Sequence, residues 1–394
     1  MRNSTEPRLP PFKQWVLFPI LFAVLSLTIV ELGLQATRLV INAGKLPNRQ
    51  YLLSPYRGQE WAKPLFREML ASRSRFDPFL GFRERPQSGM YVNIDAQGIR
   101  KSWNPALPPE AGARPVLVFG GSTVWGWGAR DDHTIPSYVA RFLLDKGTPS
   151  RVLNCGQKGY TLSQEVVQLT RMLQHGMRPQ AVVFYDGFND VFFSYRAGRA
   201  ESPFELAEHT QRFEAGDLEL ARLGLTHWVK THSAVLSTLT KLTARLKPSE
   251  RTRYGTRAPR YTDAELENLA LAIADSYAGS LDLLQHLATA YGFRCECFWQ
   301  PVIFYESELT AEETQIGPAP GDQTLGRLFV RVRQILNTRG LPHFHDLTDV
   351  YRGRQTTIYI DFAHVSEVGN RLVAARIGGT LAKEAGVEQT LDRP

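Results

Sequence analysis

The sequence predicts an α/β protein whose parallel β-sheet is covered by helices on both faces. Five short segments rich in apolar and β-branched residues resemble strands, and segments with helical periodicity separate them, as in repeated βαβ units. The first strand, residues 116–119 (VLVF), contains no polar residue, which is typical of a central strand buried on both faces. Right-handed crossovers between such units place five parallel strands in one sheet.

The expected elements follow one another between residues 116 and 384. The long helix starts at TDAE (residues 262–265), which resembles a capping box, and a glycine at position 147 ends the first helix. The expected strands are residues 116–119, 151–155, 181–185, 294–302 and 343–347. The expected helices are residues 133–147, 163–175, 262–291, 325–337 and 366–384.

Residues 15–37 form an apolar segment that precedes this domain. Residues 15–30 carry no charge, and the whole segment as a helix measures about 34 Å, against about 30 Å of hydrocarbon core. A cleaved signal peptide is the alternative, but no small-x-small cleavage site follows at the expected spacing. We therefore expect an uncleaved transmembrane signal anchor in contact with lipid. Glu31 is unusual within a span and is expected near the outer interface.

Two further regions do not follow the βαβ pattern. Residues 38–115 are rich in Pro, Arg and aromatic residues and are interpreted as an N-terminal extension that ends in a Pro-rich linker. Residues 191–261 are too long for an ordinary connection between a strand and a helix, so we expect a cap-like insertion there. The main domain then comprises residues 116–390 with this insertion.

The first strand runs into Gly120-Gly121-Ser122-Thr123, which places a serine just beyond its carboxyl end. In open α/β sheets, ligands bind beyond the carboxyl ends of the strands. The same four residues are also common in turns and at helix N-termini, so this motif alone is weak evidence for a catalytic serine.

Three more segments strengthen the case, because each follows a strand-like run and they occur in a fixed order. They are RVLNCGQKGYT (residues 151–161), AVVFYDGFND (residues 181–190) and DFAH (residues 361–364). Together with the serine motif, this set resembles the SGNH (GDSL-like) hydrolases, whose four blocks carry Ser, Gly, Asn and His. Gly-Gly-Ser-Thr stands where Gly-Asp-Ser is usual, and this form resembles a membrane-anchored bacterial branch of the family.

The resemblance implies a flavodoxin-like three-layer α/β/α fold and a role for each motif residue. Ser122 is the nucleophile, His364 the base and Asp361 the acceptor that orients the base. The backbone N–H groups of Ser122 and Gly159 and the side chain of Asn189 form the oxyanion hole. Gly156 is an alternative to Gly159, although Gly159 fits the family spacing better.

Each of these residues also has a non-catalytic interpretation. His364 can flank a helix, Asp361 can cap one, and Gly159 and Asn189 can form turns. Trp125 and Trp127 could bind substrate by stacking on a sugar or lining an acyl pocket, and core packing explains them equally well.

Composition limits the partners. The net charge of +7 is compatible with an anionic partner, but no nucleic-acid-binding motif accompanies it, so nucleic acid is not expected. The three cysteines and their spacing make a poor zinc site, and we expect neither a metal nor another cofactor. The sequence indicates no particular protein partner.

The expected function is that of a membrane-anchored serine esterase acting on a small-molecule or carbohydrate ester, such as O-acyl groups of an envelope or exported polysaccharide. The alternatives are a polysaccharide O-acyltransferase that uses the same triad, and a non-catalytic scaffold in envelope or exopolysaccharide assembly. Basic residues balance on the two sides of the span, so charge does not orient it. The short segment 1–14 and the family resemblance favour a cytoplasmic amino-terminal tail, with the catalytic domain on the periplasmic side of the inner membrane.

Overall fold

The computed structural model describes residues 11–42, 49–108, 114–204, 260–306, 308–316 and 323–391, with single residues and short runs between 210 and 238. The described residues fall into two compact units. The smaller unit lies within residues 1–47 and 208–250, and the larger within residues 48–207 and 251–394. Most of the expected cap-like insertion, residues 191–261, and part of the expected Pro-rich linker lie outside the described residues.

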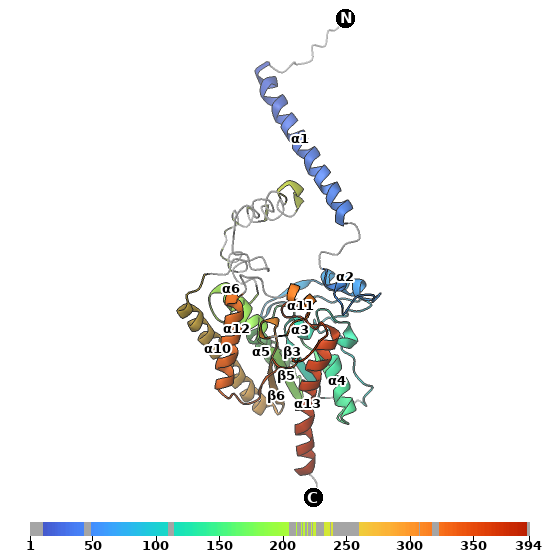
Figure 1. Ribbon diagram of the computed structural model, residues 1–394, viewed down its shortest axis with the longest axis vertical. Helices are drawn as coiled ribbons and strands as arrows, with labels where there is room; N and C mark the ends of the chain where they lie inside the picture. The colour runs from blue at the N-terminus through green and yellow to red at the C-terminus, as the bar shows by residue number, and fades with distance from the viewer. Residues whose placement is uncertain are drawn as a thin grey trace. The chain divides into compact units, whose positions relative to one another are not determined.

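The larger unit contains the predicted five-stranded parallel sheet, with strand order β4-β3-β5-β6-β7. Figure 1 labels the three strands β3, β5 and β6. The strands are β3 (Val116–Gly120), β4 (Val152–Asn154), β5 (Ala181–Asp186), β6 (Arg294–Trp299) and β7 (Phe344–Asp346). Every residue of β3 and β5 is buried, as expected for central strands covered on both faces. The predicted fold class is confirmed.

Alternate residues of the strands face two separate hydrophobic clusters, which makes the structure three-layered. Leu117 and Phe119 belong to one cluster, and Val116 and Val118 to the other. The first cluster includes α5 (Leu162–Gln174), α6 (Phe188–Ala197), α10 (Asp263–Tyr291) and α12 (Gln323–Thr338). The second includes α4 (Ile135–Asp145) and α13 (Glu367–Leu391), which lie on the opposite side of the sheet (Figure 1).

The strand order changes direction between β3 and β5. From β3 the chain passes through α4 to the edge strand β4, and it then returns through α5 to β5 on the other side of β3. The connections that leave β3 and β5 therefore cover opposite faces, which opens a crevice at the carboxyl ends of these two strands. Ser122 follows β3 and Asn189 follows β5, so both lie at this switch point.

The segment between residues 49 and 104 packs against the sheet domain. It contains η1 (Gln50–Leu52), α2 (Ala62–Ala71) and an antiparallel hairpin of β1 (Ser74–Asp77) and β2 (Gly81–Glu84). Arg100 is 1% exposed, pairs with Asp131 at 2.9 Å, and donates to the carbonyls of Trp125, Gly126 and Ala129. The loop that follows Ser122 is thus fixed by a cation from this segment. The unit also contains the shorter elements η2 (Asp131–His133), η3 (Ile303–Tyr305) and α11 (Ala311–Ile316).

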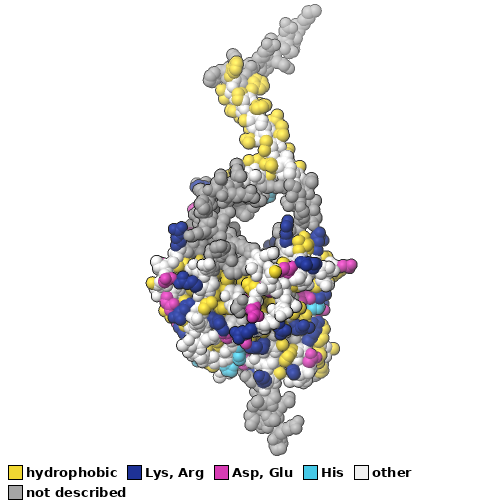
Figure 2. All heavy atoms as spheres, viewed as in Figure 1, with side chains coloured by type: hydrophobic (Ala, Val, Ile, Leu, Met, Phe, Trp, Pro, Cys, Tyr) yellow, Lys and Arg dark blue, Asp and Glu magenta, His cyan; other side chains and the backbone are white. Residues whose placement is uncertain are grey.

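The smaller unit contains α1 (Pro11–Asn42), a helix long and apolar enough over Trp15–Thr37 to cross a membrane. Its apolar side chains are exposed along the helix, as Figure 2 shows. Glu31 accepts hydrogen bonds from the hydroxyl of Ser233 and the backbone N–H groups of Ala234 and Val235. Its carboxylate therefore caps the start of the short helical run 234–236, an arrangement that the sequence pattern does not predict.

Candidate active site

Ser122 is the first residue of the short helix α3 (Ser122–Trp125), immediately after β3 and Gly121. Gly121 lies against the side chain of Asn189. A Cβ atom added at this position would lie 2.4 Å from Asn189 Nδ2, well inside any real contact distance. The absence of a side chain at residue 121 therefore leaves room for the asparagine amide next to Ser122 in the sequence.

Ser122, His364 and Asp361 form a continuous hydrogen-bonded chain. Ser122 Oγ lies 2.6 Å from His364 Nε2, and His364 Nδ1 lies 2.7 Å from Asp361 Oδ2. An ionised carboxylate only accepts, so Nδ1 carries the proton and Nε2 is free to accept from the serine hydroxyl. The loop that holds the acid and the base is closed by the bond from Ile360 N to His364 O, at 2.9 Å.

Asp361 remains ionised because donors surround it. Burial acts to raise the pKa of this carboxyl, but the His364 ring and the backbone N–H groups of His364 and Ala363 lower the pKa below its usual value. These two backbone groups donate to Asp361 Oδ1 at 2.8 and 3.0 Å, which leaves Oδ2 for the imidazole. The carboxylate is thus suited to hold His364 in one tautomer.

The residues expected at the oxyanion hole with Ser122 are Gly159, in the loop after β4, and Asn189, in the first turn of α6. Asn189 is 8% exposed at the start of α6, and its Nδ2 donates to the carbonyl of Tyr160 at 2.6 Å. Gly159 precedes that tyrosine and has a φ of +82°, which favours glycine. The Gly156 alternative is instead packed on backbone, because a Cβ there would lie 2.4 Å from the nitrogen of Trp125.

The two tryptophans after the serine have different surroundings. Trp125 is fully buried, with the guanidinium of Arg100 and the ammonium of Lys158 within 4.8 Å of its ring centre. Trp127 is only partly buried, and its ring centre lies 5.9 Å from that of His364. Of the two, Trp127 is placed to contact a group bound at the triad.

Three acidic side chains lie together near the start of α6. Glu165 and Asp186 are buried and Asp190 is partly buried, and burial together with the neighbouring carboxyls raises the pKa of Glu165 and Asp186 well above the usual range. Burial raises the pKa of Asp190 to about 6, while its Oδ1 accepts from the N–H of Leu162 at 3.0 Å. Asp190 therefore ties α6 to the start of α5.

Gln50 is a site residue that the sequence patterns do not single out. Its side-chain Nε2 donates to Asp361 Oδ2 at 2.8 Å, and its Oε1 accepts from the indole N–H of Trp127 at 2.9 Å. No motif or periodicity marks this glutamine, because the contact joins residues 311 positions apart.

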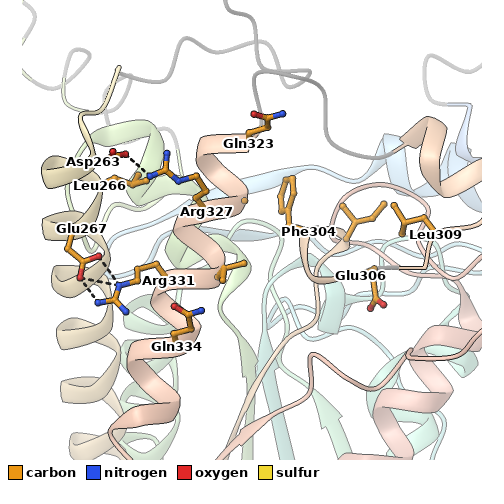
Figure 3. A pocket seen from close by; sticks show the side chains of 13 residues that line it. Asp263, Leu266, Glu267, Phe304, Glu306, Leu309, Gln323, Arg327, Arg331 and Gln334 are labelled. Atoms are coloured by element: carbon orange, nitrogen blue, oxygen red, sulfur yellow. Dashed lines mark hydrogen bonds and ion pairs between the residues drawn. The ribbon is translucent and has the colours of Figure 1, made fainter.

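A pocket of about 560 Å³ lies between α10, α12 and η3 (Figure 3). On one side, Arg327 pairs with Asp263 and Arg331 pairs with Glu267, so the two helices are bridged by ion pairs. Phe304 forms part of the opposite wall. None of the lining residues belongs to the predicted site.

Within the described part of the chain, no group of three or more His, Cys, Asp or Glu side chains is arranged to hold a metal ion.

Comparison with known proteins gives structural neighbours only. No family model and no curated protein matches the chain. The acetyl xylan esterase AlAXEase is 13% identical, with 68% of this chain and 98% of that chain covered and a TM-score of 0.36. A lipase/acylhydrolase from Enterococcus faecalis is 14% identical, with 69% of this chain and 96% of that chain covered and a TM-score of 0.32. The acetylxylan esterase Axe2 from Geobacillus stearothermophilus is 15% identical, with 68% of this chain and 92% of that chain covered and a TM-score of 0.31. At such low identities and TM-scores, a functional assignment depends on the site geometry of this chain itself.

Proposed function

We propose that this protein is an SGNH-type serine hydrolase that cleaves esters through an acyl-serine intermediate. The observation that carries this proposal is the Ser122–His364–Asp361 chain, with distances of 2.6 and 2.7 Å at the switch point of the sheet. A serine hydroxyl is a weak nucleophile near neutral pH, and a base within hydrogen-bonding reach is what activates it.

In the proposed reaction, Ser122 Oγ attacks the ester carbonyl while His364 Nε2 takes the hydroxyl proton. Asp361 stabilises the resulting imidazolium through its bond to Nδ1. His364 then donates the proton to the departing alcohol, which leaves an acyl group on Ser122. A water molecule, deprotonated by the same imidazole, attacks that acyl group and releases the acid and the free serine.

Negative charge develops on the carbonyl oxygen in both tetrahedral intermediates. Asn189 Nδ2 and the backbone N–H groups of Ser122 and Gly159 are the proposed donors to this oxygen. Each donor of this kind contributes about 10²- to 10³-fold in rate. The close approach of Asn189 to Gly121 supports its place in this set.

Hydrolysis of the acyl-serine requires that water reach the base. The side chains of His364 and Asp361 are 17% and 22% exposed, so water can reach the imidazole without rearrangement of the described residues. The partly buried ring of Trp127 beside His364 can stack on a sugar, which supports a carbohydrate ester as substrate.

The proposed location is the inner membrane, with the catalytic unit on the periplasmic side. The exposed apolar surface of α1 supports insertion of Trp15–Thr37 into lipid as a single-pass anchor. O-acyl groups of an envelope or exported carbohydrate are the substrates that such a location would make accessible.

The test is labelling with a fluorophosphonate probe, combined with turnover of p-nitrophenyl acetate by the full-length protein in detergent. Ser122→Ala should abolish labelling and lower kcat by several orders of magnitude, since the nucleophile is lost. Ser163→Ala, which removes a partly buried hydroxyl from α5, is the matched control and should behave as wild type. Undiminished turnover by folded Ser122→Ala protein would rule out the proposed mechanism.

A further inference from the structure

Gln50 contacts the triad from a segment that precedes the sheet domain in the sequence. It is the first residue of η1 and lies 13 positions after Thr37, the end of the apolar span. Its Nε2 donates to Asp361 Oδ2 at 2.8 Å and to the carbonyl of Ile360 at 3.1 Å. The orientation of this amide is determined by its partners, because the indole N–H of Trp127 can only donate and the other two groups only accept.

The amide group of Gln50 acts on the oxygen that orients the catalytic base. Asp361 Oδ2 accepts from both Gln50 Nε2 and His364 Nδ1, at 2.8 and 2.7 Å. Through its other end, Gln50 also holds Trp127, whose ring lies beside that of His364. Gln50 therefore sets the position of two neighbours of the imidazole.

The segment around Gln50 is attached to the loop that carries Trp127. Tyr56 is 1% exposed, and its hydroxyl donates to the carbonyl of Gly128 at 2.8 Å. The Gly128 N–H points to the sulfur of Met69 in α2, at 3.3 Å. The ring of Tyr56 also packs edge-on against those of Trp61 and Phe66.

A second attachment joins the same segment to the loop that precedes Asp361. Glu312 accepts from the backbone N–H of Ser54 at 2.9 Å and pairs with Arg57 at 2.8 Å. The same carboxylate accepts from the hydroxyl of Thr357 at 3.2 Å. The two loops that flank the imidazole are thus both bound to residues 49–72, which fixes where Gln50 can lie.

We infer that Gln50 is a positioning residue for catalysis, which holds Asp361 and Trp127 in their places beside His364. The segment that follows the apolar helix in the sequence thus contributes to the active site. This inference rests on the proposed serine hydrolase function. Its chemical basis is that an imidazole displaced by about 1 Å from the serine can cost about 10²-fold in rate.

The decisive variant is Gln50→Met, which keeps the length of the side chain and removes both polar groups. The matched control is Gln59→Ala, because Gln59 also accepts from an indole N–H, that of Trp61 at 3.0 Å, but contacts no triad residue. The full-length protein is assayed in detergent with p-nitrophenyl acetate, below the temperature at which each variant begins to unfold. Gln50→Met should lower kcat about ten- to a hundred-fold with KM within twofold of wild type, and Gln59→Ala should leave both unchanged.

Gln50→Glu adds a readout that a merely structural role would not move. Its carboxylate places a second negative charge against Asp361, which favours the protonated form of His364, so the acid limb of the kcat/KM profile should shift to higher pH. The inference is overturned if Gln50→Met has the kcat of Gln59→Ala, if only KM rises, or if the acid limb of Gln50→Glu does not move. Ser122→Ala distinguishes failure of the hydrolase proposal from failure of the Gln50 inference. Activity that survives Ser122→Ala refutes the hydrolase proposal. If Ser122→Ala is inactive while Gln50→Met keeps full activity, only the role of Gln50 is refuted.

Discussion

Gly121→Ala is expected to disable the oxyanion hole although it replaces none of the proposed site residues. A Cβ at this position would lie 2.4 Å from Asn189 Nδ2, so the amide must move by about 1 Å to reach an ordinary contact distance. Asn189 has little room to move, since it is 8% exposed and bonded to the carbonyl of Tyr160 at 2.6 Å. The φ of Gly121 is −73°, outside the left-handed region that favours glycine, and the expected consequence of the methyl group is the clash with Asn189.

The expected loss is that of one oxyanion donor. Displacing Asn189 should lower kcat by about 10²- to 10³-fold, equivalent to about 2.7–4 kcal/mol of transition-state stabilisation. KM should change little, because the ester carbonyl carries a full negative charge only after attack. Steady-state kinetics with p-nitrophenyl acetate would measure both quantities.

A double-mutant cycle tests whether the methyl group acts through the asparagine. Gly121→Ala and Asn189→Ala should each lower kcat by similar factors, and the double variant should be no worse than Asn189→Ala alone, since both changes remove the same donor. Gly279→Ala is the control, because a Cβ at that position in α10 meets no atom within 4 Å. Wild-type kcat in Gly121→Ala, or multiplied losses in the double variant, would refute this account of the site.

Two further predictions concern stability and location. The pKa of Asp190 is raised to about 6 from an ordinary 3.8, so the fold favours the protonated carboxyl. The contribution of Asp190 to the free energy of unfolding is therefore fully present below pH 4 and falls by up to about 3 kcal/mol as the pH rises through 6. Asp190→Asn retains an oxygen that accepts from the N–H of Leu162 but cannot ionise. In thermal unfolding, the stability of this variant relative to wild type should therefore increase between pH 4 and 7. A difference that does not depend on pH would contradict this prediction. The full-length chain should stay with membranes through carbonate extraction and should expose its catalytic unit to protease added outside the inner membrane. Deletion of residues 1–47 should release a soluble enzyme that keeps Gln50. A full-length protein found in the cytosolic fraction would exclude the proposed anchor.

The sequence was sufficient to predict the sheet, and it named residues that the structure places at one edge of that sheet. Apolar runs such as residues 116–119 can be buried on both faces only as central strands, and helical patterns between them impose parallel pairing. Because parallel strands end at the same edge of a sheet, residues that follow different strands converge there. Ser122 and Asn189 are brought together in this way, by a rule that needs no knowledge of side-chain contacts.

The sequence could not distinguish residues whose roles depend on packing between distant segments. Trp125 and Trp127 are two positions apart and had equal claims to contact substrate, yet only Trp127 lies partly exposed beside His364. The pattern between residues 38 and 115 likewise did not predict helix α2 or the hairpin of β1 and β2. These elements are short, and their stability comes from contacts with the sheet domain rather than from local propensity.

Gln50 shows most directly what only the tertiary structure decided. A glutamine has no intrinsic preference that marks it as a neighbour of the triad, and its proposed role depends on bonds to Asp361 and Trp127, which are 311 and 77 positions away. Periodicity and motif spacing report on local conformation and on the ends of strands. The direction of a single amide group is instead determined by how the loops that surround it pack, which no local pattern encodes.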